Sequence, residues 1–219
     1  MKKKQMWVLG LCAAATLGGM AAIGNAVAAE PARKSNYIRA KAGVMQPASG
    51  FDQACYDAGP DVGFAYGRYL GEHCLLEGAI ESFGAEKEAK GTTLTTGSYT
   101  QENDIGVTAL LLTLKGEYPA GPVNLSGGAG IGVYEVGLNS TIKSEKVGEY
   151  KADDNETVLG AHLTVGASYD LSQSFFVGIE GLYRWTEKVK IEKTAVSVPV
   201  SYKDNLDGYT VAATFGFRF

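Results

Sequence analysis

Asp-Gly-Tyr-Thr-Val-Ala-Ala-Thr-Phe-Gly-Phe-Arg-Phe, residues 207–219, shows most clearly the pattern that decides the fold. Every second residue from Tyr209 to Phe219 is apolar, and the residues between them are small or polar. A period of two indicates a β-strand, whose successive side chains point to opposite faces. A soluble sheet would keep its outward face polar, so we expect this apolar face to contact lipid and Arg218 to point into a lumen.

The same alternation recurs along the chain, which is typical of an all-β protein. The predicted strands are residues 37–45, 62–70, 74–83, 105–117, 123–136, 157–170, 175–185 and 207–219. Short turns are expected at 71–73, 118–122 and 171–174, and long polar loops at 46–61, 84–104, 137–156 and 186–206. Alternating short and long connections are typical of an up-and-down barrel with short periplasmic turns and longer extracellular loops.

The predicted fold is therefore an eight-stranded antiparallel up-and-down transmembrane β-barrel. Unpaired backbone N–H and C=O groups cost several kcal/mol each in hydrocarbon, so the sheet must close on itself. Closure requires the first strand to pair with the last. An even number of strands then leaves both chain termini on the periplasmic side.

The N-terminus has the features of a secretory signal peptide. Lys2, Lys3 and Lys4 precede an apolar run over 6–23, and the small residues Val27-Ala28-Ala29 form a cleavage motif. We expect a signal peptide over residues 1–29 and an outer-membrane β-barrel domain over 30–219. A retained membrane anchor is the alternative, but no basic stop-transfer flank follows the run.

Composition and cysteine spacing exclude some partners and bonds. A formal charge of −4 gives no basic face for nucleic acid. Cys12 follows Leu11 rather than a small residue, so we do not expect it to carry a lipid. Cys55 and Cys74 lie at opposite ends of a predicted strand, beyond the ~7 Å Cα separation that a disulfide allows, so both should be free thiols.

Charged residues occupy the predicted lumen face of several strands. By parity this face carries Arg39, Lys41, Glu77, Glu81, Lys115, Glu117, Glu180, Arg184 and Arg218. An eight-stranded barrel is just wide enough to be filled by its own side chains. We therefore interpret these residues as an internal salt-bridge network, with a narrow polar path as the alternative.

No catalytic, metal or cofactor site is expected. His73 is placed on a turn and His162 on a lumen face, too scattered to form a zinc site with the cysteines. His162-Leu163-Thr164 loosely resembles the His-x-Ser pair of lipid A deacylases, but Thr replaces Ser and both residues should point inward. The acidic group Asp153, Asp154 and Glu156 lacks the ligand spacing of a known calcium loop and should be a solvated loop.

Aromatic residues near the predicted strand ends indicate two girdles at the membrane interfaces. The expected girdle residues are Tyr37, Tyr118, Tyr169, Phe175, Phe217 and Phe219 near the turns, and Tyr134, Trp185 and Tyr209 near the loops.

Three segments resemble the small outer-membrane β-barrel proteins of the OmpA, OmpX and OmpW type, over the whole mature chain. These are Leu75-Leu76-Glu77-Gly78, the segment from Phe176 to Arg184, and the C-terminal Phe-Gly-Phe-Arg-Phe of 215–219. The resemblance implies a porin-like barrel in the outer membrane of a Gram-negative cell envelope. It also implies that Phe215, Phe217 and Phe219 form the assembly signal read by the barrel-assembly machinery, after delivery by periplasmic chaperones.

The fold alone does not determine the function. We expect a non-enzymatic, monomeric barrel with a filled polar lumen, surrounded by lipid and lipopolysaccharide, whose long loops serve envelope integrity or surface interaction. A narrow porin-like channel for small or hydrophobic solutes is the alternative. A lipid-modifying enzyme is a remote third hypothesis.

Overall fold

A computed structural model describes residues 34–48, 57–93, 97–144, 148–195 and 198–219. The expected signal peptide, Cys12 and Cys55 lie outside these residues and stay predictions. Among the described residues, no helix is long and apolar enough to cross a membrane.

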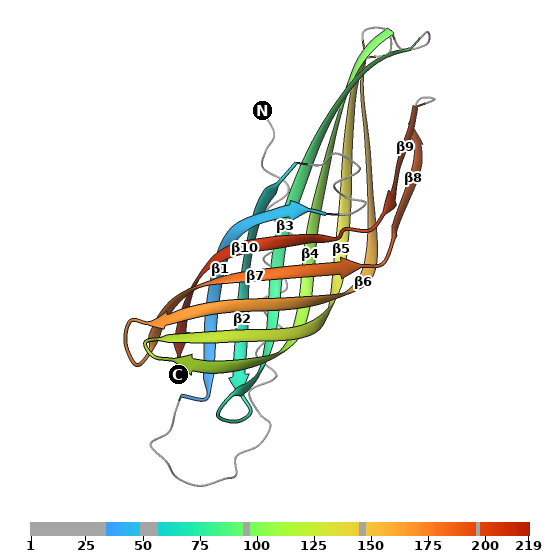
Figure 1. The fold of residues 1–219 in the computed structure, drawn as a ribbon. Coiled ribbons are helices and arrows are strands. Elements are labelled where there is room, and N and C mark those ends of the chain that lie inside the picture. The colour runs from blue at the N-terminus through green and yellow to red at the C-terminus, as the bar shows by residue number, and fades with distance from the viewer. Residues whose placement is uncertain (1–33, 49–56, 94–96, 145–147, 196–197) are drawn as a thin grey trace.

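Ten strands make up the described structure. They are β1 (Asn36–Pro47), β2 (Gly59–Tyr69), β3 (Cys74–Thr93), β4 (Gly97–Ala120), β5 (Val123–Ser144), β6 (Gly148–Asp170), β7 (Phe175–Thr186), β8 (Val189–Ala195), β9 (Val198–Asp204) and β10 (Gly208–Arg218). Eight of them form a closed barrel in the order β1-β10-β7-β6-β5-β4-β3-β2, while β8 and β9 form a separate two-stranded sheet (Figure 1). The predicted eight-stranded antiparallel barrel is confirmed.

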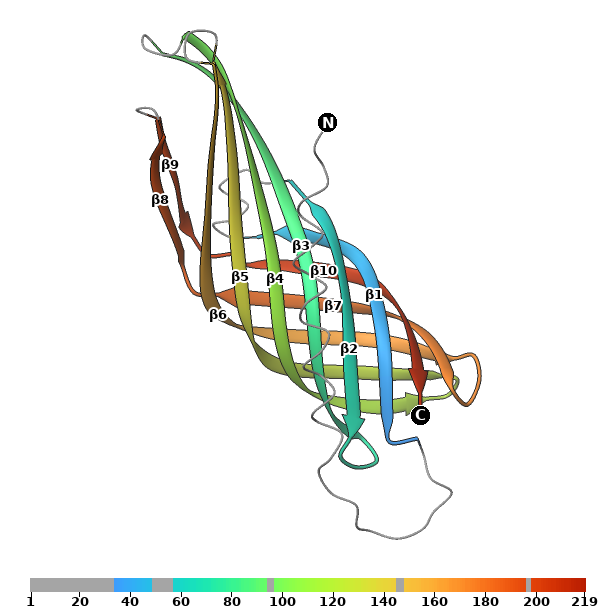
Figure 2. The ribbon, with the colours of Figure 1, turned by 180° about the vertical axis from the view of Figure 1, so that it is seen from behind.

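The barrel closes where β1 meets β10 (Figure 2). Their antiparallel register runs from Tyr37 opposite Arg218 to Pro47 opposite Gly208. Beyond the ladder, Asn36 N donates to Phe219 O at 3.1 Å and Phe219 N donates to Asn36 O at 2.9 Å. The first and last strands of the barrel therefore leave no open edge between them, as the membrane requires.

Alternating burial divides each barrel strand into two faces. The outward face carries large apolar side chains, of which Phe64, Ile131 and Val165 are each 67% exposed. These side chains are exposed in the absence of lipid, so they mark the band that a bilayer covers. The inward face holds the buried polar and charged residues.

The predicted loops at 84–104 and 137–156 are wrong. β3 and β4 stay paired up to Thr93 opposite Gly97, and β5 and β6 up to Ser144 opposite Gly148. Figure 1 shows these strands rising well beyond the rest of the barrel. Both faces of a strand outside the membrane can be polar, so these ladders continue without the apolar alternation that identifies a membrane strand.

Two further segments expected to be loops also contain strands. Residues 186–206, expected to be a loop, contain the β8–β9 hairpin. Asp153, Asp154 and Glu156 lie in β6 rather than in a loop. Of the predicted loop 46–61, residues 49–56 lie outside the described part of the chain.

Short turns connect the strands at the opposite end of the barrel. Leu70 N donates to Cys74 O at 2.8 Å in the β2–β3 turn, and Leu171 N donates to Phe175 O at 2.9 Å in the β6–β7 turn. Gly121 has a φ of 66° in the turn between β4 and β5, a conformation that favours glycine. This turn is shorter than predicted, because β4 continues to Ala120.

Two of the predicted girdle aromatics point into the lumen instead. Tyr37 is 5% exposed and Tyr134 is fully buried. Glycines on neighbouring strands make room for both rings: a Cβ at Gly67 would lie 2.1 Å from Tyr37 Cζ, and one at Gly160 would lie 2.8 Å from Tyr134 Cε2. The girdle residues exposed on the outer surface are Tyr118, Tyr169, Phe175, Trp185, Tyr209 and Phe219.

Candidate functional site: the lumen of the barrel

The inner face of β5 consists largely of glycine, so side chains from neighbouring strands can extend across the lumen. A Cβ at Gly130 would lie 2.2 Å from Leu112 O and 2.6 Å from His162 Nε2. The His162 ring therefore packs against Gly130, and its Nε2 is 2.8 Å from Thr113 Oγ1 of β4. In β5 the apolar residues therefore face lipid, and the glycines that alternate with them make room for side chains in the lumen.

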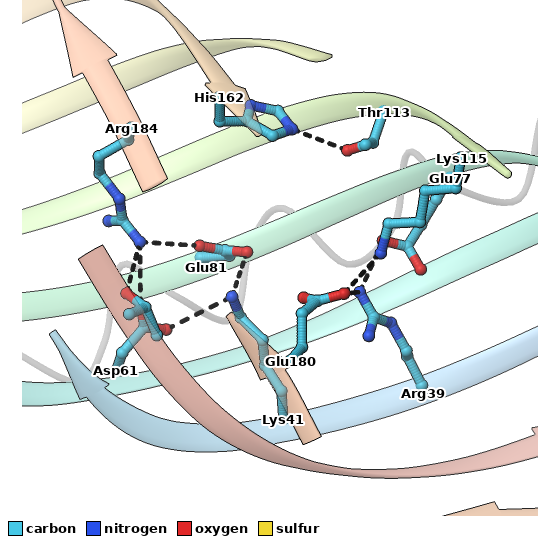
Figure 3. A network of polar contacts seen from close by, with 11 residues as sticks. Arg39, Lys41, Asp61, Glu77, Glu81, Thr113, Lys115, His162, Glu180 and Arg184 are labelled. Atoms are coloured by element: carbon cyan, nitrogen blue, oxygen red, sulfur yellow. Dashed lines mark hydrogen bonds and ion pairs between the residues drawn. The ribbon is translucent and has the colours of Figure 1, made fainter. Parts of the chain in front are cut away.

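Four ions form a closed cluster on the periplasmic side of the lumen centre, which we call the inner ring: Arg39, Lys115, Glu77 and Glu180. Glu77 Oε1 lies 2.7 Å from Arg39 Nη2 and 2.7 Å from Lys115 Nζ. Glu180 Oε2 lies 2.6 Å from each of the same two atoms. Each carboxylate is therefore shared between two cations, as Figure 3 shows.

A second cluster, which we call the outer ring, lies nearer the long hairpins: Lys41, Arg184, Asp61 and Glu81. Asp61 Oδ2 lies 3.1 Å from Arg184 Nη2, and its Oδ1 lies 3.8 Å from Lys41 Nζ. Glu81 contacts Lys41 through Oε1 and lies 3.5 Å from Arg184 through Oε2. Thr210 adds a hydroxyl that donates to Asp61 at 2.7 Å.

Both rings have no net formal charge and are largely removed from solvent. Arg184 and Asp61 have fully buried side chains, and Glu77 is 2% exposed. Removing an ion from water costs several kcal/mol, so buried charges persist only where partners are close and hydrogen-bonded. β1, β3 and β7 each contribute one residue to each ring, and the rings therefore link strands on opposite sides of the barrel.

An apolar layer closes the lumen above the outer ring. It comprises Met45, Phe83, Ala85, Ile105, Val107, Val136, Leu138, Val158, Val189 and Leu206. The Arg184 guanidinium lies 3.9 Å from the centre of the Phe83 ring, where the ring face attracts the cation. Val189 and Leu206 come from the segment between β7 and β10, so this segment covers the mouth of the barrel.

Asp207, which follows Leu206 at this mouth, holds the covering segment in place. Its Oδ1 accepts a hydrogen bond from Thr186 N at 3.0 Å, and its Oδ2 accepts one from Asn205 Nδ2 at 2.6 Å. Burial raises the pKa of the Asp207 carboxyl, the Thr186 hydrogen bond opposes this shift, and the charge of Asp204 adds to it.

A small pocket lies at the periplasmic end of the lumen, beneath the inner ring. Its volume is about 40 Å³, and its lining includes Arg39, Lys115, Glu180, Ser126 and Ser168. Ligand pockets usually span roughly 300–1,000 Å³. The pocket can therefore hold a few water molecules but no drug-sized solute.

Two of the predicted lumen residues belong to neither ring. Glu117 accepts hydrogen bonds from the Tyr69 hydroxyl at 3.0 and 3.1 Å, near the periplasmic end. Arg218 Nη1 lies 2.5 Å from Asp170 Oδ1, and its guanidinium lies 4.5 Å from the Phe176 ring centre. The other predicted residues, Arg39, Lys41, Glu77, Glu81, Lys115, Glu180 and Arg184, are all ring members.

Asp61, which pairs with both cations of the outer ring, is not among the lumen residues predicted from the sequence. Its strand was predicted to begin at Val62, which left Asp61 in a loop, whereas β2 begins at Gly59. Parity with the inward Gly63 and Ala65 is the signal that places Asp61 in the lumen. Tyr37 was missed for a different reason: its hydroxyl donates to Glu77 at 2.5 Å, yet it was assigned to the lipid interface.

The histidines stand apart from each other. His162 is 1% exposed inside the lumen, while His73 lies on the β2–β3 turn with an exposed side chain. Thr164 also faces the lumen and is 3% exposed. Among the described residues, no group of three or more His, Cys, Asp or Glu side chains could hold a metal ion. Cys74 is a free, exposed cysteine.

A closed barrel with a lipid-facing apolar band and a charged, filled interior defines the class of integral outer-membrane β-barrel proteins. The chain belongs to the outer membrane protein beta-barrel domain family, whose model matches residues 12–219. The protein is therefore located in the outer membrane. No curated protein matches the chain significantly.

Solved structures with the same fold come from several bacteria. The outer membrane protein OprG of Pseudomonas aeruginosa is similar with a TM-score of 0.57 and 16% identity, covering 85% of this chain and 97% of that one. A major outer membrane protein of Thermus thermophilus gives 0.54 and 13%, covering 84% and 100%. Neisserial surface protein A gives 0.51 and 13%, covering 84% and 97%. At these identities the likeness shows the fold alone.

We predict that Asp61→Asn destabilises the barrel by about 3 kcal/mol, because it leaves Arg184 and Lys41 with one carboxylate between them in a buried site. Glu102→Gln removes the same charge from an exposed pair with Lys143, at 3.2 Å, and should cost less than about 1 kcal/mol. Urea unfolding in lipid vesicles measures both values. Equal losses of unfolding free energy in the two variants would show that the outer ring stabilises the protein no more than an exposed ion pair does.

Proposed function

We propose that the protein is a non-enzymatic outer-membrane barrel whose sealed lumen supports rigid extracellular hairpins, and that these hairpins make contacts at the cell surface. The observation that carries this proposal is the continuation of β3, β4, β5 and β6 beyond the barrel as one ordered sheet. Outer-membrane lipid and lipopolysaccharide surround the barrel, which acts as a monomer.

The projecting sheet leaves the barrel at identifiable residues. β2 stops pairing with β3 at Asp61 opposite Phe83, and β7 stops pairing with β6 at Thr186 opposite Gly160. Beyond these points β3 to β6 pair only among themselves, with Tyr99 opposite Ser144 near the end of the β4–β5 ladder. An ordered surface loses less conformational entropy when it binds a partner than a flexible loop does. The paired sheet therefore supports a role in binding partners at the cell surface.

The closed lumen favours a supporting role over transport. The apolar layer and the two neutral rings fill the described lumen, and the pocket beneath the inner ring has a volume of only about 40 Å³. Enzymatic activity on lipid is disfavoured, because the imidazole of His162 and the hydroxyl of Thr164 both face this closed interior rather than the bilayer.

Assembly would use the last strand. Phe215 and Phe219 are exposed on the outer surface, and Phe217 stacks with Phe219 at a centroid distance of 6.1 Å. Their position beside the closing seam supports a role for Phe215, Phe217 and Phe219 as the signal recognised by the barrel-assembly machinery, after periplasmic chaperones have delivered the chain.

We predict that the purified protein gives no stable porin-like conductance in planar bilayers, because buried apolar side chains fill the lumen above the outer ring. Protein-free detergent and a known porin serve as negative and positive controls. A reproducible open state that disappears in both Glu77→Gln and Arg184→Gln would contradict the proposal and establish the alternative, a narrow channel through the rings.

A second experiment tests the hairpins directly. Residues 87–103 and 140–152 are each replaced by an Asn-Gly turn, which suits a two-residue hairpin. The barrel registers stay intact, so the trimmed protein should fold and restore detergent resistance to a deletion strain. It should not restore attachment of the cells to matrix-coated or plastic surfaces, because the contact surface is gone.

The control for this trimming replaces only residues 94–96 by the same two-residue turn, which keeps both long ladders. This variant should attach like the full-length protein. Full restoration of attachment by the doubly trimmed protein would show that the hairpins are not the contact surface.

A further inference from the structure

One side of the projecting sheet, along β3, has an open edge. Figure 1 shows β3 along one side of this sheet and β6 along the other. The base of β6 is covered by the segment before β8, since Glu187 N donates to Leu159 O at 2.9 Å. Within the described residues, β3 pairs only with β4 from Gly84 onward. We call residues 84–93 the β3 edge.

Pro60 ends the pairing between β2 and β3. The register that places Asp61 opposite Phe83 would next place Pro60 opposite Gly84. Gly84 O points toward β2, because a Cβ at Gly59 would collide with it. Pro60 has no N–H with which to bond this oxygen. The ladder therefore stops here and leaves the rest of β3 open on this side.

Every second backbone amide of the β3 edge points away from β4. In an antiparallel sheet the N–H and C=O of one residue face the same neighbouring strand, and successive residues alternate between the two neighbours. Because Gly84 faces β2, the backbone groups of Glu86, Glu88 and Lys90 face the open side. They form a row of donors and acceptors on which a further strand can pair.

The β3 edge lacks most features that keep an edge strand from pairing. Such strands are commonly short, bulged, broken by proline or charged. The register of β3 with β4 runs without interruption from Gly84 opposite Gly106 to Thr93 opposite Gly97, and residues 84–93 contain no proline. Only charges are present, and these determine which strand can bind.

The charges of the β3–β4 hairpin favour a basic partner. Glu86 and Glu88 are opposite Asp104 and Glu102, so four acids share one face of two adjacent strands. Like charges directly opposite in a ladder are destabilising. Residues 84–104 contain these four acids and two lysines, which leaves the hairpin with a net negative charge. A fifth strand with basic residues opposite Glu86 and Glu88 would reduce the repulsion.

A second copy of this chain does not fit this edge. Two copies in one membrane stand upright together, so their β3 strands would run parallel, with the same residues at the same height. Glu86 and Glu88 of each copy would then lie beside the acids of the other, which adds repulsion. The occupant is therefore a different protein.

We propose that the β3 edge is a docking site for an extended segment of a partner protein, which carries basic residues at alternate positions and adds to the sheet as a fifth strand. Backbone hydrogen bonds supply the affinity, and the basic residues opposite Glu86 and Glu88 supply the specificity. This inference rests on the proposed surface contact and names the part of the projecting sheet that makes it.

Amide hydrogen exchange, measured by NMR on the full-length protein in nanodiscs of zwitterionic lipid, tests the inference. The probe is a short peptide of alternating lysine and threonine. Without peptide, the amides of Glu86, Glu88 and Lys90 should exchange faster than those of Lys87 and Ala89, which face β4. The peptide should slow the first three. A peptide with glutamate in place of lysine, or with every residue N-methylated, should leave them unchanged.

The variant Glu88→Pro removes an outward N–H but no bond between β3 and β4, and it should weaken peptide binding about tenfold or more. Asp153→Pro is the matched control. It removes the same charge from the outer edge of β6, where odd-numbered residues face away from β5 as Leu159 does, and it should bind peptide like wild type. Heat-modifiable electrophoretic mobility establishes that each variant is folded.

Three results would overturn the docking edge. Slow exchange of the Glu88 amide before peptide is added would show that the edge is already paired. Equal binding of the N-methylated peptide would reduce the effect to charge attraction. An equal loss of binding in Asp153→Pro would show that the position of the proline is irrelevant.

Attachment of cells to matrix-coated surfaces separates this inference from the proposed function. Cells with Glu88→Pro should attach as poorly as cells with the doubly trimmed protein. Full attachment with Glu88→Pro, but not with the trimmed protein, would contradict the docking edge and leave the contact role of the hairpins intact. Full attachment with both variants would contradict both proposals.

Discussion

The pairing of backbone amides within hydrocarbon is the constraint on which the whole structure depends. A strand that crosses the bilayer has no water to satisfy its N–H and C=O groups, so both of its edges must be paired. β1 and β10 meet this requirement for each other through an unbroken antiparallel register. Once the sheet is closed, successive side chains along every strand point alternately to lipid and to the lumen.

Closure with eight strands also determines what the lumen can contain. The interior of such a barrel is filled by side chains, and any charge placed there must find its partner inside. The inner and outer rings meet this demand with equal numbers of cations and anions. Glycines on β5, β6 and β2 supply the space in which His162, Tyr134 and Tyr37 lie. The same packing that stabilises the barrel therefore fills its lumen with side chains.

Much of the membrane-embedded part is predictable from sequence, because hydrophobic alternation records which side of each strand faces lipid. That pattern identified all eight barrel strands and most ring residues by parity alone. It could not identify the projecting ladders, because Gly84–Thr93 is polar or small on both faces and reads as a loop. Nor could it identify partners: Asp61 and Arg184 are 123 positions apart, and only barrel closure brings them together.

Tyr37 and Tyr134 show a second limit of sequence reasoning. An aromatic residue near a strand end suits either the lipid interface or the lumen, and the deciding feature is a glycine on the neighbouring strand. Gly67 is directly opposite Tyr37, and Gly160 is diagonal to Tyr134. That feature depends on register, which a single strand does not reveal. The extracellular hairpins show the same limit, because the sequence gives their charged residues but not the strand pairing that places those residues.

Solid-state NMR of the protein in lipid bilayers tests the closure most directly, through proton contacts between amides of β1 and β10. The structure predicts contacts that follow the pairs Ala40 with Phe215, Ala42 with Ala213 and Val44 with Val211. Their absence, with β1 and β10 each showing contacts on one side only, would mean an open sheet and would contradict the account of a sealed barrel.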